Sequence, residues 1–135
     1  MTLHIHRKTK IRQVQKSFHE EYPYLKLEFY NRPHGWGEVS KNADRFDPSF
    51  KIFDVTRLRI EEGEVLARAW DKTGEIEEAF EKNFGLHVQV YRKNGNEWIE
   101  TAGSDELTLY EQNEIGKRSV TESHDNLWIE REVLY

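Results

Sequence analysis

The chain has 135 residues, a length that fits a single domain with a buried core. Its formal net charge of −5 disfavours broad binding to nucleic acid or anionic membranes, because both need clustered lysine and arginine. The absence of cysteine excludes disulfides, thiolate metal sites and cysteine nucleophiles. The first residues lack the apolar segment of a secretory signal, and no stretch is long and apolar enough to cross a bilayer. We therefore expect one cytoplasmic domain over 1–135, with no nucleic-acid or membrane partner.

The first thirty residues predict a strand, a helix and a second strand. Leu3 and Ile5 alternate with polar residues, as in a strand with one buried face. Apolar residues then recur three or four positions apart over 9–22, which predicts an amphipathic helix that Thr9 caps and Pro23 ends. Alternation resumes over 25–30 and indicates the second strand.

The middle of the chain repeats this order after an irregular segment at 31–49. We expect a strand over 65–70, and we leave the structure of 50–64 open. Apolar residues at helical spacing over 71–84 predict a second amphipathic helix, and Gly85 stands where a C′ glycine ends a helix. Alternation after Gly85 predicts a further strand that runs to Tyr91.

A hairpin is expected next, because Asn94-Gly95 is typical of a type I′ turn. With these two residues as the loop, Tyr91 faces Trp98 on the following strand. The capping-box spacing of Thr108 and Glu111 predicts a short third helix.

The end of the chain is expected to leave that helix and to turn back on itself. Gly116 is expected to end the third helix. Apolar alternation in the tail then predicts a C-terminal hairpin, carried by Leu127, Ile129 and Val133.

The two halves share a spacing of apolar residues through a helix and the strand after it. The related units cover about 3–30 and 65–91, and each reads strand–helix–strand. Two such units predict an α+β fold with a split β-α-β-β-α-β, ferredoxin-like sheet and helices on one face. The Asn-Gly hairpin, the third helix and the C-terminal hairpin add to this core.

One stretch resembles a known family. It is Phe84-Gly-Leu-His-Val-Gln-Val-Tyr-Arg-Lys-Asn-Gly-Asn-Glu-Trp-Ile-Glu-Thr101, followed by Thr108-Leu-Tyr-Glu-Gln-Asn113. Together these segments resemble a family of small uncharacterised bacterial proteins. The resemblance implies a bacterial cytosolic protein, and it assigns no activity and no functional residue.

A first candidate site is the sheet face opposite the helices, where aromatic and polar residues mix as they do on binding surfaces. Tyr91 and Trp98 are its aromatic candidates. The competing interpretation, which we favour, is that the C-terminal segment covers this face as a second small core. The full set predicted for the face is His4, His6, Lys26, Glu28, Tyr30, His87, Gln89, Tyr91 and Trp98.

A second candidate is a metal site on the same face. His4 and His6 lie two apart on one strand, so their side chains point the same way. In the split order the first and fourth strands are neighbours, which would bring His87 near His6, and three imidazoles can hold zinc. The alternative, which we weight more heavily, is three surface histidines without a shared ligand.

A third candidate is the run His34-Gly35-Trp36-Gly37 in the irregular segment. Flanking glycines let the backbone turn around the tryptophan, which can anchor a partner. Trp36 can equally fold back over the core, and the sequence favours neither arrangement.

The functional prediction is a non-catalytic module that binds a protein or peptide, because the sequence carries no phosphate-binding, nucleophile-elbow or zinc-protease motif. We expect no cofactor. The alternative is a small metal-dependent or hydrolytic enzyme that uses the histidines of the outer face. Self-association into a homodimer through a sheet edge or the last hairpin stays open as a third interpretation.

Overall fold

The computed structural model describes residues 1–31, 44–56, 58 and 62–134, with side chains described as far as residue 122. Within these ranges no helix combines the length and apolar character needed to cross a membrane. The elements follow the order β1 (Thr2–His6), α1 (Ile11–Glu21), β2 (Leu25–Tyr30), α2 (Ile52–Val55), β3 (Glu62–Leu66), α3 (Thr73–Phe84), β4 (His87–Asn94), β5 (Glu97–Glu100), a 3-10 helix (Ala102–Ser104) and α4 (Leu109–Leu134).

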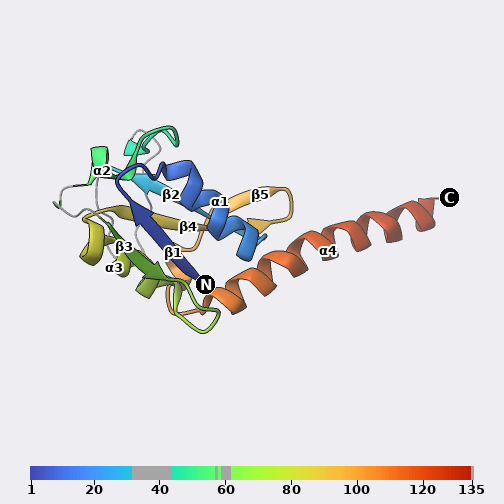
Figure 1. Ribbon diagram of the computed structural model, residues 1–135. Helices are drawn as coiled ribbons and strands as arrows, with labels where there is room; N and C mark the ends of the chain where they lie inside the picture. The colour runs from blue at the N-terminus through green and yellow to red at the C-terminus, as the bar shows by residue number, and fades with distance from the viewer. Residues whose placement is uncertain (32–43, 57, 59–61, 135) are drawn as a thin grey trace.

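The predicted α+β class is confirmed, with a different strand order. Among the described residues, β1 pairs with β3 in one antiparallel sheet, and β2, β4 and β5 form a second antiparallel sheet in that order. Figure 1 shows the long helix α4 leaving the body of the molecule. The split order would make β4 a neighbour of β1, but β4 lies between β2 and β5. Local alternation defines a strand without defining its neighbour, so the order could not be derived from it.

The helical stripes predicted from the sequence form the core. Helix α1 buries Ile11, Val14 and Phe18, and α3 buries Ile76, Phe80 and Phe84. The rings of Phe29 and Phe80 meet edge to face at a centroid distance of 5.6 Å, which joins β2 to α3. Gly85 has φ 62° and ends α3 in the left-handed conformation, as predicted. The strand predicted over 65–70 lies earlier, at Glu62–Leu66.

The start of α1 differs slightly from the prediction. Its N-cap is Lys10, whose backbone N–H donates to Gln13 Oε1 at 2.8 Å. Thr9 instead holds the end of β1, because its hydroxyl oxygen accepts the backbone N–H of His6 at 3.0 Å. The turn between β1 and α1 is therefore fixed from both sides.

The hairpin after β4 forms with a shifted loop. Its two loop residues are Gly95 and Asn96, and of these only Gly95 has a positive φ, 63°. Glycine at the first central position is typical of a type II′ turn. Trp98 consequently faces Lys93, and Tyr91 faces Glu100, so the predicted Tyr91–Trp98 pair is wrong.

The prediction for the C-terminal third is also wrong, since α4 runs unbroken from Leu109 to Leu134 where a hairpin was expected. Its capping box is confirmed by the bond from Glu111 N to Thr108 Oγ1 at 3.1 Å. Gly116 does not end the helix. A Cβ there would lie 2.9 Å from Tyr24 Cβ and 3.2 Å from Arg92 Cγ, so this glycine permits α4 to approach the sheet closely.

We expect Gly116→Ala to lower the free energy of unfolding by about 1–3 kcal/mol, the usual cost of overpacking. This loss should appear although alanine is the better helix former by about 1 kcal/mol. The matched control is Gly103→Ala, where a Cβ meets no atom within 4 Å and the change should stay within about 0.5 kcal/mol. Urea unfolding measures both, and equal stability of the two variants would show that α4 does not need this close approach.

Candidate functional site

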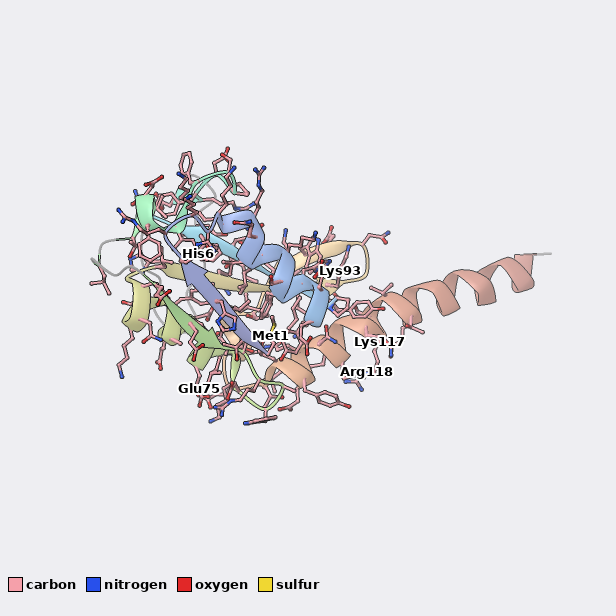
Figure 2. The ribbon with its side chains drawn as sticks, in the orientation of Figure 1. Met1, His6, Glu75, Lys93, Lys117 and Arg118 are labelled. Carbon is pink, nitrogen blue, oxygen red and sulfur yellow. The ribbon has the colours of Figure 1, made fainter. Side chains whose placement is uncertain are left out.

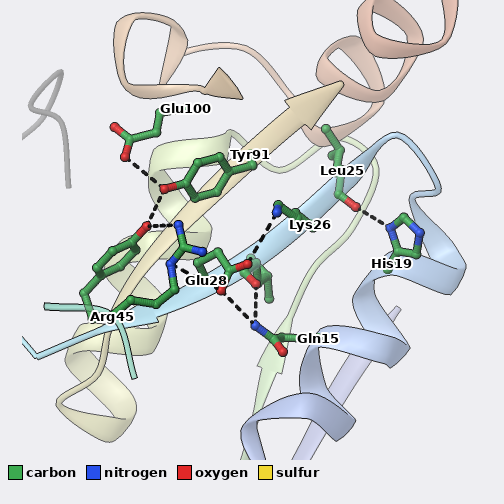
Figure 3. A network of polar contacts seen from close by, with 10 residues as sticks. Gln15, His19, Leu25, Lys26, Glu28, Arg45, Tyr91 and Glu100 are labelled. Atoms are coloured by element: carbon green, nitrogen blue, oxygen red, sulfur yellow. Dashed lines mark hydrogen bonds and ion pairs between the residues drawn. The ribbon is translucent and has the colours of Figure 1, made fainter. Parts of the chain in front are cut away.

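Neighbouring elements supply hydrogen-bond partners to the edge of β2 that does not pair with β4. In its ladder with β4, the odd-numbered residues of β2 turn their carbonyl groups away from β4. Two of these carbonyls bind side chains of α1 (Figure 3), and the third binds a backbone N–H. The bonds run from His19 Nδ1 to Leu25 O (2.8 Å), from Gln15 Nε2 to Leu27 O (2.9 Å) and from Phe46 N to Phe29 O (2.8 Å).

The face of this sheet opposite the core carries the polar and aromatic residues that alternation places there. We call it the polar face, and its members on the three strands are Lys26, Glu28, Tyr30, His87, Gln89, Tyr91, Lys93, Trp98 and Glu100. Much of it is inaccessible: Tyr30 and Gln89 are fully buried, and Glu28 and Tyr91 are nearly so. Trp98 is half-buried.

The carboxylate of Glu28 is the centre of a charge network on this face. It accepts a hydrogen bond from Gln15 Nε2 at 3.2 Å and pairs with Lys26 Nζ at 3.5 Å. Arg45 Nε lies 3.8 Å from Glu28 Oε2, the oxygen that also accepts the bond from Gln15 (Figure 3). A buried carboxylate is tolerated when it is paired and hydrogen-bonded in this way, so Glu28 adds no uncompensated negative charge.

Tyr91 belongs to a second part of the network. Its hydroxyl is hydrogen-bonded to the hydroxyl of Tyr30 and donates to Glu100 Oε1 at 3.0 Å. Burial, the bond to Tyr30 and the Glu100 carboxylate all raise its pKa far above the ordinary tyrosine value. Tyr91, which was predicted as a binding residue, is therefore nearly buried, and its hydroxyl is engaged with Tyr30 and Glu100.

A groove runs between α1 and the polar face. We call it the α1 groove, and its volume is about 430 Å³. Its lining includes three cationic side chains, those of Arg12, Lys16 and Lys26. Among the lining residues the only carboxylate is that of Glu28, which is already paired. Its lining residues are Arg12, Gln15, Lys16, His19, Lys26, Leu27, Glu28, Pro48 and Trp98.

Trp98 is held in this groove by several contacts. The ammonium groups of Lys26 and Lys93 each lie 5.0 Å from its ring centroid, within cation–π range. The imidazole of His19 meets the indole edge to face at 5.9 Å. Because His19 donates its Nδ1 proton to Leu25 O, a neutral ring keeps Nε2 as an acceptor.

The structure treats the predicted binding residues differently. Trp98 lines an open groove, whereas Tyr91 is nearly buried and is not among the lining residues of that groove. His34 and Trp36 fall outside the described residues. The α1 side chains Arg12, Lys16 and His19 were not predicted, although their spacing of four and three residues marks one helix face.

The histidines predicted to bind metal do not come together. His4 and His6 lie on β1, whereas His87 lies on β4 in the other sheet, opposite Tyr30. His4 Nδ1 is 3.5 Å from Glu64, and His6 Nδ1 accepts the backbone N–H of Lys8 at 3.3 Å. Within the part of the chain that the structure describes, no three histidine or acidic residues are grouped so that they could hold a metal ion.

The buried carboxyl group of Glu77 binds the backbone of β4 beyond the last residue that pairs with β5. The backbone N–H of Val90 donates to Glu77 Oε2 at 3.2 Å. Burial and the nearby Asp105 raise the pKa of Glu77 to about 9, since both disfavour its charged form. Glu77 is thus a neutral acid at physiological pH, and it fixes α3 to the sheet.

Comparisons with protein-family models, curated proteins and solved structures found no match to this chain.

We expect Glu77→Gln to remove a pH dependence of stability. The unfolded chain releases this proton near pH 4.5 and the folded chain only near pH 9, so wild type loses stability as pH rises between these values. Urea unfolding measures the free energy of unfolding of both proteins. From pH 5 to 9, the value for the variant should rise relative to that for wild type by an amount on the order of a few kcal/mol. Glu81→Gln, on the exposed side of α3, is the control. A constant difference across this range would refute the assignment.

Proposed function

We propose that this protein is a non-catalytic binding module that holds an acidic segment of a protein partner in the α1 groove. The observation that carries the proposal is the local excess of positive charge beside Trp98, in a chain whose net charge is −5. Clefts lined by one sign of charge attract groups of the opposite sign.

Two of the three cations that line the groove are exposed and able to receive a ligand. Lys26 is engaged with Glu28, but the lining residues Arg12 and Lys16 lie one helical turn apart on the exposed side of α1. Lys16 lies 3.8 Å from Glu20 in an exposed ion pair, an interaction that is weak and easily exchanged. An arginine guanidinium matches a carboxylate with two parallel hydrogen bonds, so Arg12 favours an aspartate or glutamate side chain.

The aromatic wall supports a peptide as the ligand. Trp98 offers a large contact area with few rotatable bonds, and its position is already fixed by Lys26, Lys93 and His19. Leu27 and Pro48 extend the apolar part of the wall. A segment that alternates acidic and apolar side chains would use both kinds of contact.

The enzyme alternative loses the geometry on which it depended, because His87 is separated from His4 and His6 by the strand order. The cytoplasmic location and the bacterial family remain proposals that rest on sequence composition and on the resemblance.

The test uses a fluorescein-labelled peptide of about ten residues with alternating glutamate and valine. We expect saturable binding by fluorescence anisotropy, and a loss of about tenfold in affinity in the double variant Arg12→Glu/Lys16→Glu, since two charge contacts are reversed. The control Lys82→Glu/Lys117→Glu makes the same charge change at exposed sites on α3 and α4 (Lys117 in Figure 2) and should bind normally.

A second peptide, with lysine in place of glutamate, separates charge recognition from apolar adhesion. Equal binding of both peptides, or equal losses in both double variants, would contradict the proposal.

A further inference from the structure

The outer edge of β1 turns alternate backbone groups away from β3. Met1 and Ala67 exchange both backbone hydrogen bonds, at 3.0 and 3.3 Å. Bonded and non-bonded pairs alternate along an antiparallel ladder, so Leu3 and Ile5 bond to β3 while the even-numbered residues point outward. The bonds of His6 agree with this parity, because its N–H and its carbonyl both bind Thr9 on the outer side.

Two outward positions on this edge are left open. In the part of the chain that the structure describes, the outward backbone groups of Thr2 and His4 make no hydrogen bond. Each residue presents one N–H and one carbonyl, the pattern that an added strand needs. Thr9 closes the edge at the His6 end, so the open stretch has a defined limit (His6 in Figure 2).

A slot of about 260 Å³ lies along this edge, between β1 and α1. Its buried residues are Leu3, Thr9 and Val14. Gln13 and Ser17 stand on the exposed side of α1. Figure 1 shows α1 beside β1. Thr2, His4 and His6 of β1 complete the lining of the slot.

Helix α1 closes one strand edge and leaves the other open because its side chains differ in reach. Gln15 and His19 are long enough to bond the carbonyls of β2. On the side of β1, the oxygen of Gln13 is used by Lys10 N, and Ser17 is short. Among the described residues, no side chain of α1 therefore bonds the outward backbone groups of Thr2 and His4.

The shape of the slot selects a single extended segment. A strand that enters it has β1 on one side and α1 on the other, so it cannot belong to a wider sheet. The β1 strand of a second copy does not fit the slot, because that strand already carries β3 and lies beside its own α1.

The charge around the slot indicates which end of a bound segment lies near Thr9. His6, Arg7 and Lys8 are exposed there, and Lys10 precedes the first turn of α1. Acidic residues are favoured beside such a group and beside a helix N-terminus. Antiparallel pairing, the slightly more stable arrangement, places these acidic residues at the N-terminal end of the segment.

We propose that the outer edge of β1 is a strand-addition site, where an extended segment of a protein partner, acidic at its N-terminal end, pairs with Thr2 and His4 in the slot beside α1. The site is separate from the α1 groove and does not depend on the function proposed for it.

Amide hydrogen exchange followed by NMR tests the proposal on the intact chain. The probe is an acetylated peptide of two aspartates followed by alternating valine and threonine. In the free protein, the Leu3 and Ile5 amides should exchange slowly and those of Thr2 and His4 quickly. The probe should slow exchange at Thr2 and His4 by about tenfold or more, and leave Leu3 and Ile5 unchanged. The same protection is expected in the Arg12→Glu/Lys16→Glu protein, which separates the slot from the α1 groove.

Two chemical controls address the hydrogen bonds themselves. Two N-methylated probes are compared, one methylated at its odd-numbered residues and one at its even-numbered residues. Only one set of peptide N–H groups faces β1, so one probe should lose the protection of the His4 amide and the other should keep it. On the protein, His4→Pro removes the outward N–H, a change tolerated on edge strands, whereas His4→Val retains it. Probe binding should fall at least tenfold in the proline variant relative to the valine variant.

The proposal is overturned if the probe leaves the His4 amide unprotected, or if both N-methylated probes protect it equally. It is also overturned if the His4 amide becomes protected with rising protein concentration alone, while light scattering reports a dimer, because the occupant would then be a second copy. If His4→Pro does not fold, the N-methylated probes decide the question.

Discussion

Antiparallel pairing turns alternate backbone groups of every edge strand outward, and the position of α1 decides what happens to them on β1 and β2. On β2, Gln15 and His19 supply the missing partners, so that edge is closed against aggregation and against ligands. On β1 the same helix stands beside the edge without bonding Thr2 or His4. The two candidate surfaces of the protein therefore lie on opposite sides of one helix.

The polar face shows how a buried polar layer can support an open groove. Glu28 is held by Gln15, Lys26 and Arg45, and the Tyr91 hydroxyl bridges Tyr30 and Glu100 (Figure 3). Buried polar groups with partners on several elements rigidify the surface above them, since each bond lost would leave an unsatisfied group. Trp98 contacts this layer through Lys26, which also pairs with Glu28.

Sequence periodicity predicted α1 and α3 well, because each buries a single stripe against the core, as Val14 and Phe80 do. It did not predict strand order, which depends on contacts between segments far apart in the chain. The hairpin loop moved by one residue because Gly95, not Asn94, takes the first central turn position. Gly116 was misread since a stop signal and a close-packing position look alike in sequence. Trp98 was predicted as a candidate, but Arg12 and Lys16, which line the same groove, come from a helix whose place beside β2 was unknown.

The central claim is that the α1 groove is the surface that receives acidic partner segments. A nitroxide spin label on the glutamate–valine peptide tests it most directly, because the label broadens the NMR signals of nearby amides in the unmodified protein. We expect broadening centred on Lys16, Lys26 and Trp98, with the signals of Glu81 and Lys82 on α3 unaffected. Broadening spread evenly over the molecule, or centred away from α1 and Trp98, would contradict it.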